Sequence, residues 1–523
     1  MAPADSKIGA GAGRSAAAAG AWAKFLLPTL PGMLAAATLI YCLFVFDAGR
    51  QLFRDSDTGW HIRNGEWMLA NHVLPRADRY SFSKPGEPWV AWEWGADVVM
   101  GAAHRADGLR GLVVLFALAI AALTWMCARL HFAAGGDFLL AALLAAPMVT
   151  TASLHWLARP HVFSWLFVAG AVLYAERAPL RFGFAHAAGI ALVTAAWANM
   201  HGSFFLGPAI ALIYAAAHFA RPWLWDLDAH TEHMRGRWFL LAALAAGAGS
   251  LLNPYGWRLH AHVVSYLWND ELTSRVAEFQ SFNFHDPEAA QVALTMALAA
   301  AGAVLALSQR KLAHFLLAAM LLWGGLRSAR VLPLVALVIL PLANGAFAEA
   351  LRGARRMQPG LRRALDRVLR YSEGLRRIDR SVNGTMFLGG VALVCLLVLR
   401  APAVASRIGF PADRFPTAAA EAVEKLPSDA RVFAPDSFGG YLVYRFAGER
   451  KVFFDGRSDF YGAAFMKQYL VLRNAQPGWE QIAREYRFTH ALVAPDSALN
   501  AALQHNGWKT LHKDETAVLL EAR

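Results

Sequence analysis

Asp55-Ser-Asp-Thr-Gly-Trp-His61 directly follows the first long apolar segment of the chain, which covers residues 33–46. Ionisable side chains next to an apolar segment are costly to keep when that segment lies in lipid, so they mark working sites by default. Two carboxylates and an imidazole in one short stretch therefore indicate a site at a boundary between lipid and water. The segments around this stretch decide the fold class.

The composition is that of a membrane protein. Of 523 residues, 57% are hydrophobic and only 17% are charged, so a large apolar surplus must face lipid. We therefore predict an α-helical polytopic membrane protein. Residues 1–20 form a Gly/Ala-rich arm without an apolar core, and we expect this arm to be disordered and cytoplasmic.

The apolar pattern predicts about eleven membrane spans within residues 21–399, although several are shorter than the roughly 20 residues of a typical span. The predicted spans cover residues 33–46, 112–127, 138–154, 162–175, 187–198, 204–219, 239–252, 289–307, 312–326, 331–347 and 382–399.

The distribution of positive charge sets the predicted topology. Between residues 351 and 380 lie ten Arg against three acids. Such a run is compatible with nucleic-acid binding, but apolar segments flank it on both sides. A cytoplasmic loop at 349–381 that obeys the positive-inside rule is the better interpretation, so we expect no nucleic-acid partner. The N-terminus is then cytoplasmic.

This topology brings the unusual polar clusters to one outer face, as expected for a site assembled from many loops. The first outer loop, residues 47–110, carries the acidic stretch and a predicted helix over residues 58–72 that lies along the membrane surface. Asp57 directly precedes that helix, and because it is four residues from His61 the two would share a face. An alternative is that Asp57 only caps the helix, but Asp55 and His61 nearby favour a working site.

Further candidates lie at other outer span ends, and each could instead be a structural turn. Arginine suits phosphate recognition because its planar fork is bidentate and always charged. These candidates are Arg159, His161, Asn199, His201, Arg258 and Arg330.

Residues 400–523 differ in character from the rest of the chain. Short apolar runs at 430–433, 452–454, 491–494 and 517–520 alternate with helical patterns at 418–426, 460–472 and 479–486. This alternation predicts a soluble, periplasmic α/β domain with a mostly parallel sheet. Loops at the ends of such strands bind ligands, and here they carry Asp436, Tyr441, Asp455 and Arg457.

Taken together, these features resemble the GT-C superfamily of membrane glycosyltransferases. The shared elements are an acidic motif soon after the first span, a first outer loop with surface helices, and a soluble domain after the last span. Asp55-Ser-Asp57 stands where that superfamily carries its catalytic acid. Asp436-Ser-Phe-Gly-Gly-Tyr441 is similar to an oligosaccharyltransferase motif but lacks its tryptophans, so no acceptor-sequon binding is carried over. The resemblance is to a bacterial branch.

The resemblance implies transfer of a sugar, with inversion, from a polyprenyl-phosphate or polyprenyl-diphosphate donor to an envelope acceptor that is lipid, glycan or protein. The reaction would take place at the periplasmic face of the bacterial inner membrane. Asp57 is the expected base. Asp55 would orient the acceptor or, with Asp57, hold a divalent cation such as Mg²⁺ or Mn²⁺.

The remaining candidates would bind substrate. The positively charged and imidazole side chains are expected at the donor phosphate, and the others at the sugar or acceptor. The first group comprises His61, Arg159, His161, His201, Arg258 and Arg330, and the second comprises Trp60, Asn199, Asp436, Tyr441, Asp455 and Arg457.

Three other functions remain open. An O-antigen ligase or polymerase has a similar number of spans but works mainly through Arg and His. A lipid-linked sugar transporter would carry ionisable groups at mid-depth, and few are found here. A non-enzymatic scaffold for polysaccharide assembly is the third alternative.

Overall fold

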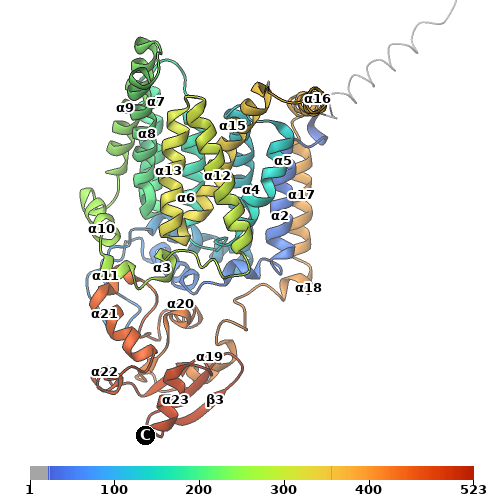
Figure 1. The fold of residues 1–523 in the computed structure, drawn as a ribbon. Helices are drawn as coiled ribbons and strands as arrows, with labels where there is room; N and C mark the ends of the chain where they lie inside the picture. The colour runs from blue at the N-terminus through green and yellow to red at the C-terminus, as the bar shows by residue number, and fades with distance from the viewer. Residues whose placement is uncertain (1–21, 23, 355) are drawn as a thin grey trace, which may run out of the picture.

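The computed structural model describes residue 22 and residues 24–354 and 356–523, so the expected disorder of residues 1–20 concerns a segment outside the described residues. A bundle of long helices occupies one end of the molecule. The C-terminal part of the chain, from residue 400, lies beyond the other end of the bundle and contains the small sheet (Figure 1). We call this part the tail.

Each apolar segment of the sequence forms a helix or most of one. The helices of the bundle are α2 (Leu30–Ile40) with a π-helical continuation (Tyr41–Val45), α4 (Trp94–Ala133), α5 (Phe138–Ser153), α6 (His161–Ala175), α7 (Phe184–Met200), α8 (Leu206–Leu224), α9 (Ala229–Ser250), α12 (Ala289–Ser308), α13 (Leu312–Arg327), α14 (Leu332–Leu334), α15 (Leu340–Gly353) and α17 (Thr385–Leu399).

Among the described residues, four helical stretches are long and apolar enough to cross a membrane, or five if one bent pair is counted as a span. They support a membrane protein, whereas the count of eleven spans stays a prediction. Five more apolar helices are shorter than a full span. The four long stretches are Trp94–Ala133, Gly202–Leu224, Ala289–Ser308 and Ala329–Gly353.

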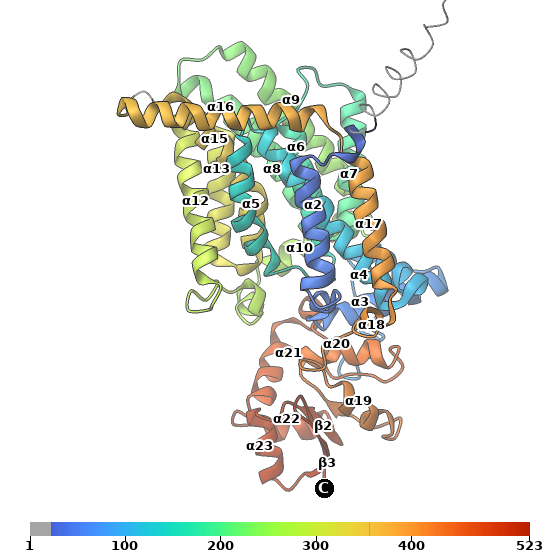
Figure 2. The ribbon, with the colours of Figure 1, turned by 90° about the vertical axis from the view of Figure 1, so that its right-hand side faces the viewer.

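The basic segment after α15 is a helix, α16 (Pro359–Ser381), which lies across the end of the bundle far from the tail (Figure 2). The chain bends by 77° between α16 and α17. Near the end of α16, the buried Asp379 accepts a hydrogen bond of 2.6 Å from the backbone N–H of Leu30 and pairs with Arg376. One carboxylate thus joins the start of α2 to the arginine-rich helix.

The first outer loop packs as helix on helix. Helix α3 (Asp57–Asn71) lies against the first part of α4, which is kinked at Asp107 and Gly108. A Cβ atom on Gly65 would lie 1.7 Å from the carbonyl oxygen of Asp97. Only glycine permits this approach, which sets the position of α3 beneath the bundle.

The tail sheet has four strands in the order β1-β2-β4-β3. Only β1 and β2 are parallel and the other pairs are antiparallel, so the prediction of a mostly parallel sheet is wrong. The apolar run 452–454 is not a sheet strand, because Val452 instead forms an isolated bridge with Ser81. The strands are β1 (Val432–Phe433), β2 (His490–Val493), β3 (Lys509–Lys513) and β4 (Val518–Glu521).

The helices predicted in the tail are confirmed as α19 (Thr417–Glu424), α21 (Ser458–Arg473) and α22 (Trp479–Glu485). Two further helices were not expected, namely α20 (Asp436–Arg445) and α23 (Ala498–His505).

Helix α20 corrects the expectation of a ligand-binding loop at 436–441. A Cβ atom on Gly440 would lie 2.2 Å from the carbonyl oxygen of Ser56, and one on Gly59 would lie 2.2 Å from the carbonyl oxygen of Gly440. The glycines therefore serve close packing of α20 on α3.

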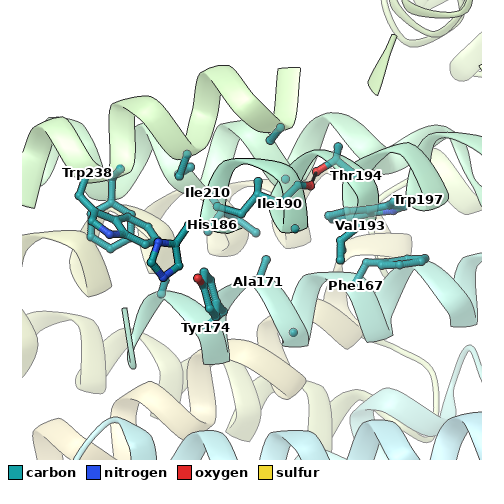
Figure 3. Close-up of a pocket in the computed structure, with 18 of the residues that line it drawn as sticks. Phe167, Ala171, Tyr174, His186, Ile190, Val193, Thr194, Trp197, Ile210 and Trp238 are labelled. Atoms are coloured by element: carbon teal, nitrogen blue, oxygen red, sulfur yellow. Dashed lines mark hydrogen bonds between the residues drawn. The ribbon is translucent and has the colours of Figure 1, made fainter. Parts of the chain in front are cut away.

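A cavity of about 500 Å³ lies within the bundle, between α6, α7, α8 and α9. Its walls are mainly apolar, with Tyr174, His186 and Trp238 at one end and Phe167 and Trp197 at the other (Figure 3).

Candidate functional site

A second cavity, of about 390 Å³, opens where the bundle meets the tail. Residues that line it come from the start of α3, the turn before α6, the segment before α8, helix α13 and the tail loop at 456–459. Its ionisable lining residues are Asp57, Glu93, His155, Arg159, His161, His201, Glu278, Arg330, Arg457 and Asp459.

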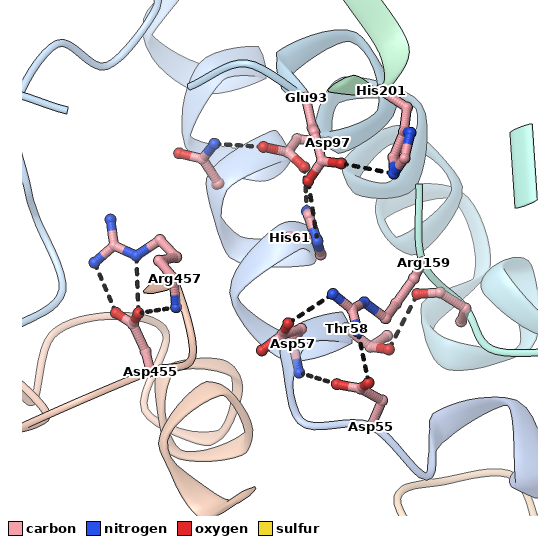
Figure 4. A network of polar contacts seen from close by, with 12 residues as sticks. Asp55, Asp57, Thr58, His61, Glu93, Asp97, Arg159, His201, Asp455 and Arg457 are labelled. Atoms are coloured by element: carbon pink, nitrogen blue, oxygen red, sulfur yellow. Dashed lines mark hydrogen bonds and ion pairs between the residues drawn. The ribbon is translucent and has the colours of Figure 1, made fainter. Parts of the chain in front are cut away.

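Arg159 is the centre of this site. Its Nη1 lies 2.8 Å from Oδ2 of Asp55, and its Nη2 lies 2.9 Å from Oδ2 of Asp57 (Figure 4). Nη1 also pairs with Glu278, whose other oxygen lies 3.2 Å from Nη1 of Arg330. One guanidinium that is only 12% exposed thus contacts three carboxylates.

Local structure places Arg159 next to α3. The residue lies in the turn before α6, and this turn is held by two hydrogen bonds. The backbone N–H of Ala158 donates to the carbonyl of Leu52 at 2.8 Å, and the hydroxyl of Thr58 donates to the carbonyl of Ala158 at 3.0 Å. Both bonds tie the turn to the segment that carries the acidic motif.

Asp57 does not cap α3. The N-cap is Ser56, whose hydroxyl donates instead to the carbonyl of Asp436 in the tail at 2.8 Å. Asp57 is the first helical residue, and its N–H donates to Oδ1 of Asp55 at 2.9 Å. The two acids are therefore held together by the backbone and both face Arg159.

The tail approaches Asp57 through Gly456. This glycine has φ +89°, and a Cβ atom on it would lie 2.4 Å from Oδ1 of Asp57. The residues on either side fix the loop, because Arg457 Nε lies 2.9 Å from Asp455 Oδ1 and Arg457 also pairs with Asp78. Arg457 lines the cavity, whereas Asp455 supports it from behind.

A chain of buried polar groups extends from the other side of the site (Figure 4). His61 Nδ1 lies 2.5 Å from Asp97, and its Nε2 lies 3.9 Å from Glu93. Glu93 in turn lies 3.4 Å from Nε2 of His201, whose Nδ1 is 2.8 Å from the hydroxyl of Ser203. His61 is fully buried and acts behind the cavity wall, whereas Glu93 and His201 line the cavity.

Burial and charge shift the proton affinities of these groups. Burial raises the pKa of Asp57 well above its usual value, and Asp55 and Glu278 add to the rise against the opposing effect of Arg159. Burial also favours the neutral form of Glu278, but Arg159 and Arg330 outweigh it and hold that pKa well below its usual range. Burial raises the pKa of Glu93 to about 7. Glu93 is thus suited to exchange protons near neutral pH, and Asp57 binds a proton more readily than an exposed aspartate.

The structure gathers most of the candidates named from the sequence. Asp55, which pairs with Arg159, stands at the cavity, and His61 and Asp455 stand behind its wall. The candidates that line it are Asp57, Trp60, Arg159, His161, His201, Arg330 and Arg457.

Four candidates lie elsewhere. Arg258 is on the exposed side of α10 (Trp257–Leu267), and Asn199 accepts a hydrogen bond from Trp94. Asp436 accepts one from the hydroxyl of Tyr469 at 2.6 Å. Tyr441 packs against aromatic rings of the tail. Asn199, Asp436 and Tyr441 thus have structural contacts away from the cavity, and Arg258 faces outward.

Three important residues were missed or ranked low. Glu278 was not among the candidates, because its position in the sequence gave no sign of its contact with Arg159. Glu93 is the acid within the Trp-rich part of the first outer loop, which was a usable signal. Gly456 lies in a Phe-Asp-Gly-Arg stretch, and only the fold shows that it contacts Asp57.

Across residues 24–354 and 356–523, no group of three or more His, Cys, Asp or Glu is arranged to hold a metal ion. The two acids expected to share a cation, Asp55 and Asp57, each give one oxygen to Arg159.

The bundle, the helical first outer loop and the tail together form a fold that is also found in a solved structure. Among solved structures, the chain is similar to the archaeal oligosaccharyltransferase AglB from Archaeoglobus fulgidus, in complex with an inhibitory peptide and a dolichol-phosphate. The TM-score is 0.57 at 10% sequence identity, over 89% of this chain and 69% of that one. At this identity the likeness shows the fold. No family model matches the chain, and no curated protein matches its sequence.

Proposed function

We propose that this protein is a membrane glycosyltransferase that moves a sugar from a polyprenyl-phosphate or polyprenyl-diphosphate donor to an envelope acceptor, which is a lipid, a glycan or a protein. The observation that carries the proposal is the cavity in which Asp57 and Arg159 meet. We place it on the periplasmic side of a bacterial inner membrane, because the arginine-rich α16 lies at the opposite end of the bundle.

The lining of the cavity matches the two parts of a lipid-linked phosphate, which are a charged head and an apolar chain. One part of its lining is ionisable and includes Arg159 and Arg330, while another is apolar and comes from helices of the bundle. A donor with a charged head and an isoprenoid chain divides in the same way. The structurally similar archaeal oligosaccharyltransferase was solved in complex with an inhibitory peptide and a dolichol-phosphate. This supports a lipid-linked donor and an acceptor for the present chain as well.

In the proposed reaction, Asp57 takes the proton from the acceptor hydroxyl as its oxygen attacks the anomeric carbon. The bond between that carbon and the phosphate oxygen breaks, and the phosphate leaves with the electron pair. The configuration at the anomeric carbon is thereby inverted. A carboxylate whose pKa lies above its usual value binds that proton more readily than an exposed aspartate. Arg330 supplies positive charge where the leaving phosphate gains negative charge.

Arg159 takes the place that a divalent cation would hold. A metal would need free oxygens from Asp55 and Asp57, yet the guanidinium already binds both acids and Glu278. The donor set therefore does not fit a metal, and no step of the mechanism requires one. Arg159 orients Asp57 and favours its ionised form by direct pairing.

The test is release of polyprenyl phosphate from a panel of synthetic polyprenyl-phosphate and polyprenyl-diphosphate sugars. The purified protein would be assayed in lipid nanodiscs with a crude envelope extract as acceptor. Asp57→Asn should abolish release. Asp413→Asn, which alters an exposed acid of the tail, is the matched control and should leave release unchanged. No release from any donor would reject the proposal in favour of a transporter or a scaffold.

A further inference from the structure

A third cavity, of about 260 Å³, lies at the end of the bundle that carries α16, between α6, α8, α9 and α13. Helix α6 begins at the candidate site with His161 and ends at this cavity with Ala175, which places the two about 20 Å apart at 1.5 Å per residue. We call it the inner polar cavity. It is a separate site from the one at Asp57.

Glu176 lines the inner polar cavity, Glu232 contacts two of its lining residues, and both acids already have partners. Glu176 accepts a hydrogen bond from the hydroxyl of Tyr214 at 2.6 Å and pairs with His314 at 2.9 Å. Glu232 pairs with His218 at 2.7 Å and with Arg221 at 2.9 Å. Both carboxylates are therefore already paired with neighbouring side chains.

One positive charge, that of Arg235, has no acidic partner among the described residues. No carboxylate among the described residues lies within 4 Å of the Arg235 guanidinium. Its Nη1 donates only to the carbonyls of Ala178 and Pro179, at 3.0 and 3.4 Å. The Nε of Arg221 is buried and finds no partner in the described part of the chain. Lys311 reaches only Glu349, which is half exposed. Within the described chain, Arg235 is thus unpaired, and Arg221 and Lys311 keep N–H donors that their acidic partners do not use. Such donors on one cavity are suited to a phosphate group.

The inner polar cavity adjoins the apolar cavity of the bundle. Ala175 and Phe239 line both of them. From that junction the apolar cavity continues between α6 and α9 past Ile190 and Val193 towards Trp197 (Figure 3). Its volume of about 500 Å³ is within the range of ligand cavities. The two adjoining cavities together therefore have a basic end and a long apolar part.

We propose that the adjoining cavities bind one anionic phospholipid. Its phosphate lies among Arg221, Arg235 and Lys311, and an acyl chain lies in the apolar cavity. Basic pockets between membrane helices recognise such headgroups. This proposal does not depend on the reaction at Asp57, because it concerns the other end of the bundle.

The first test is native mass spectrometry of the purified full-length protein after titration with phosphatidylglycerol. We expect one tightly retained phosphatidylglycerol and no comparable retention of phosphatidylcholine. Arg235→Gln should weaken retention at least about tenfold, because it removes one charge-assisted contact. Arg237→Gln changes an exposed arginine two residues further along α9, and it should retain the lipid as the wild type does.

A second pair of variants tests the acyl chain. A Cβ atom on Gly189 or on Gly247 would meet open space, but of these two glycines only Gly189 lines the apolar cavity. Gly189→Leu should therefore lower phosphatidylglycerol retention, and Gly247→Leu should not.

Several results would overturn the proposal. They are equal retention of phosphatidylcholine, equal loss in both members of either variant pair, displacement of the lipid by millimolar inorganic phosphate alone, or a preference for polyprenyl phosphate. The third would indicate a free-phosphate site, and the fourth would indicate a second donor-lipid site.

Discussion

Replacing Arg159 by methionine should both disable the site and change what it binds. The substitution keeps a long side chain but removes the guanidinium that Asp55, Asp57 and Glu278 share. Breaking a buried ion pair from one side costs about 3–5 kcal/mol, because the partner charge is left uncompensated. The loss of one preorganised charge at a reacting centre lowers turnover by about 10²–10³-fold.

The pH dependence of this destabilisation follows from Glu278. Arg159 and Arg330 hold its pKa below the usual value in the folded protein. A depressed carboxyl pKa contributes stability that is present above the unfolded-state pKa and is lost as pH falls through the folded-state pKa. The difference in unfolding temperature between wild type and Arg159→Met should therefore be large at pH 7 and should shrink as the medium becomes acidic.

The freed acids should also gain affinity for a cation. Carboxylate oxygens are the ligands that hard divalent ions prefer, so Arg159→Met should bind Mn²⁺ while the wild type does not. The loss of free-Mn²⁺ signal in electron paramagnetic resonance measures this directly, without any transferase activity. Arg258→Met, which removes an exposed arginine away from the cavity, should change neither stability, turnover nor Mn²⁺ binding.

Two outcomes would refute the reasoning. Wild-type protein that binds one equivalent of Mn²⁺ and loses donor turnover in a chelator would show that a metal, and not Arg159, is the central cation. An Arg159→Met variant with wild-type stability and turnover would show that the three carboxylates do not depend on the guanidinium. If no donor is turned over at all, stability and Mn²⁺ binding still decide the question.

Two further substitutions probe the walls of the site. Gly456→Ala should lower donor turnover at least tenfold, because a Cβ atom there meets Asp57 Oδ1. Gly462 is the control, because it has a similar φ of +77° but a Cβ atom on it would meet open space. Gly462→Ala carries the same backbone cost of about 1–2 kcal/mol and should keep its turnover. Glu93→Gln should raise the unfolding temperature at pH 8 but not at pH 4. Between pH 4.5 and about 7, Glu93 of the folded wild type binds a proton that the unfolded chain does not. The wild type therefore loses up to about 3 kcal/mol of stability as pH rises through that window. The exposed Glu87→Gln should show no such change, and an equal shift in both would mean that Glu93 is not held neutral by burial.

The sequence was sufficient to locate the centre of the site, for a physical reason. Asp55, Asp57 and Arg159 are charged residues next to apolar segments, where an unpaired charge is costly. Charge distribution also placed these loops on one face, and the structure brings them within hydrogen-bond distance of one another. Polarity against an apolar background is a signal that a single sequence carries.

The remainder depended on contacts between distant segments. Glu278 reaches Arg159 across 119 residues, and nothing in its local sequence indicates this partner. Arg258 carries the same charge as Arg159 in an equally plausible turn, yet it faces outward on α10. The β3 strand, Lys509–Lys513, is a largely exposed edge with no apolar alternation, so the mixed sheet could not be recognised from the pattern of apolar runs.

The contacts of the tail show that it forms part of the candidate site. Gly440 and Gly59 bring α20 and α3 into backbone contact, and the Ser56 hydroxyl bonds to the tail carbonyl of Asp436. Ser56 is the residue between the two acids of the motif, so the same backbone that holds the tail also orients the acids. Gly456 then meets Asp57 from the tail side. Because interiors packed this closely do not deform continuously, a displacement of the tail would move the wall against Asp57, and the geometry of the acid depends on the tail remaining in place.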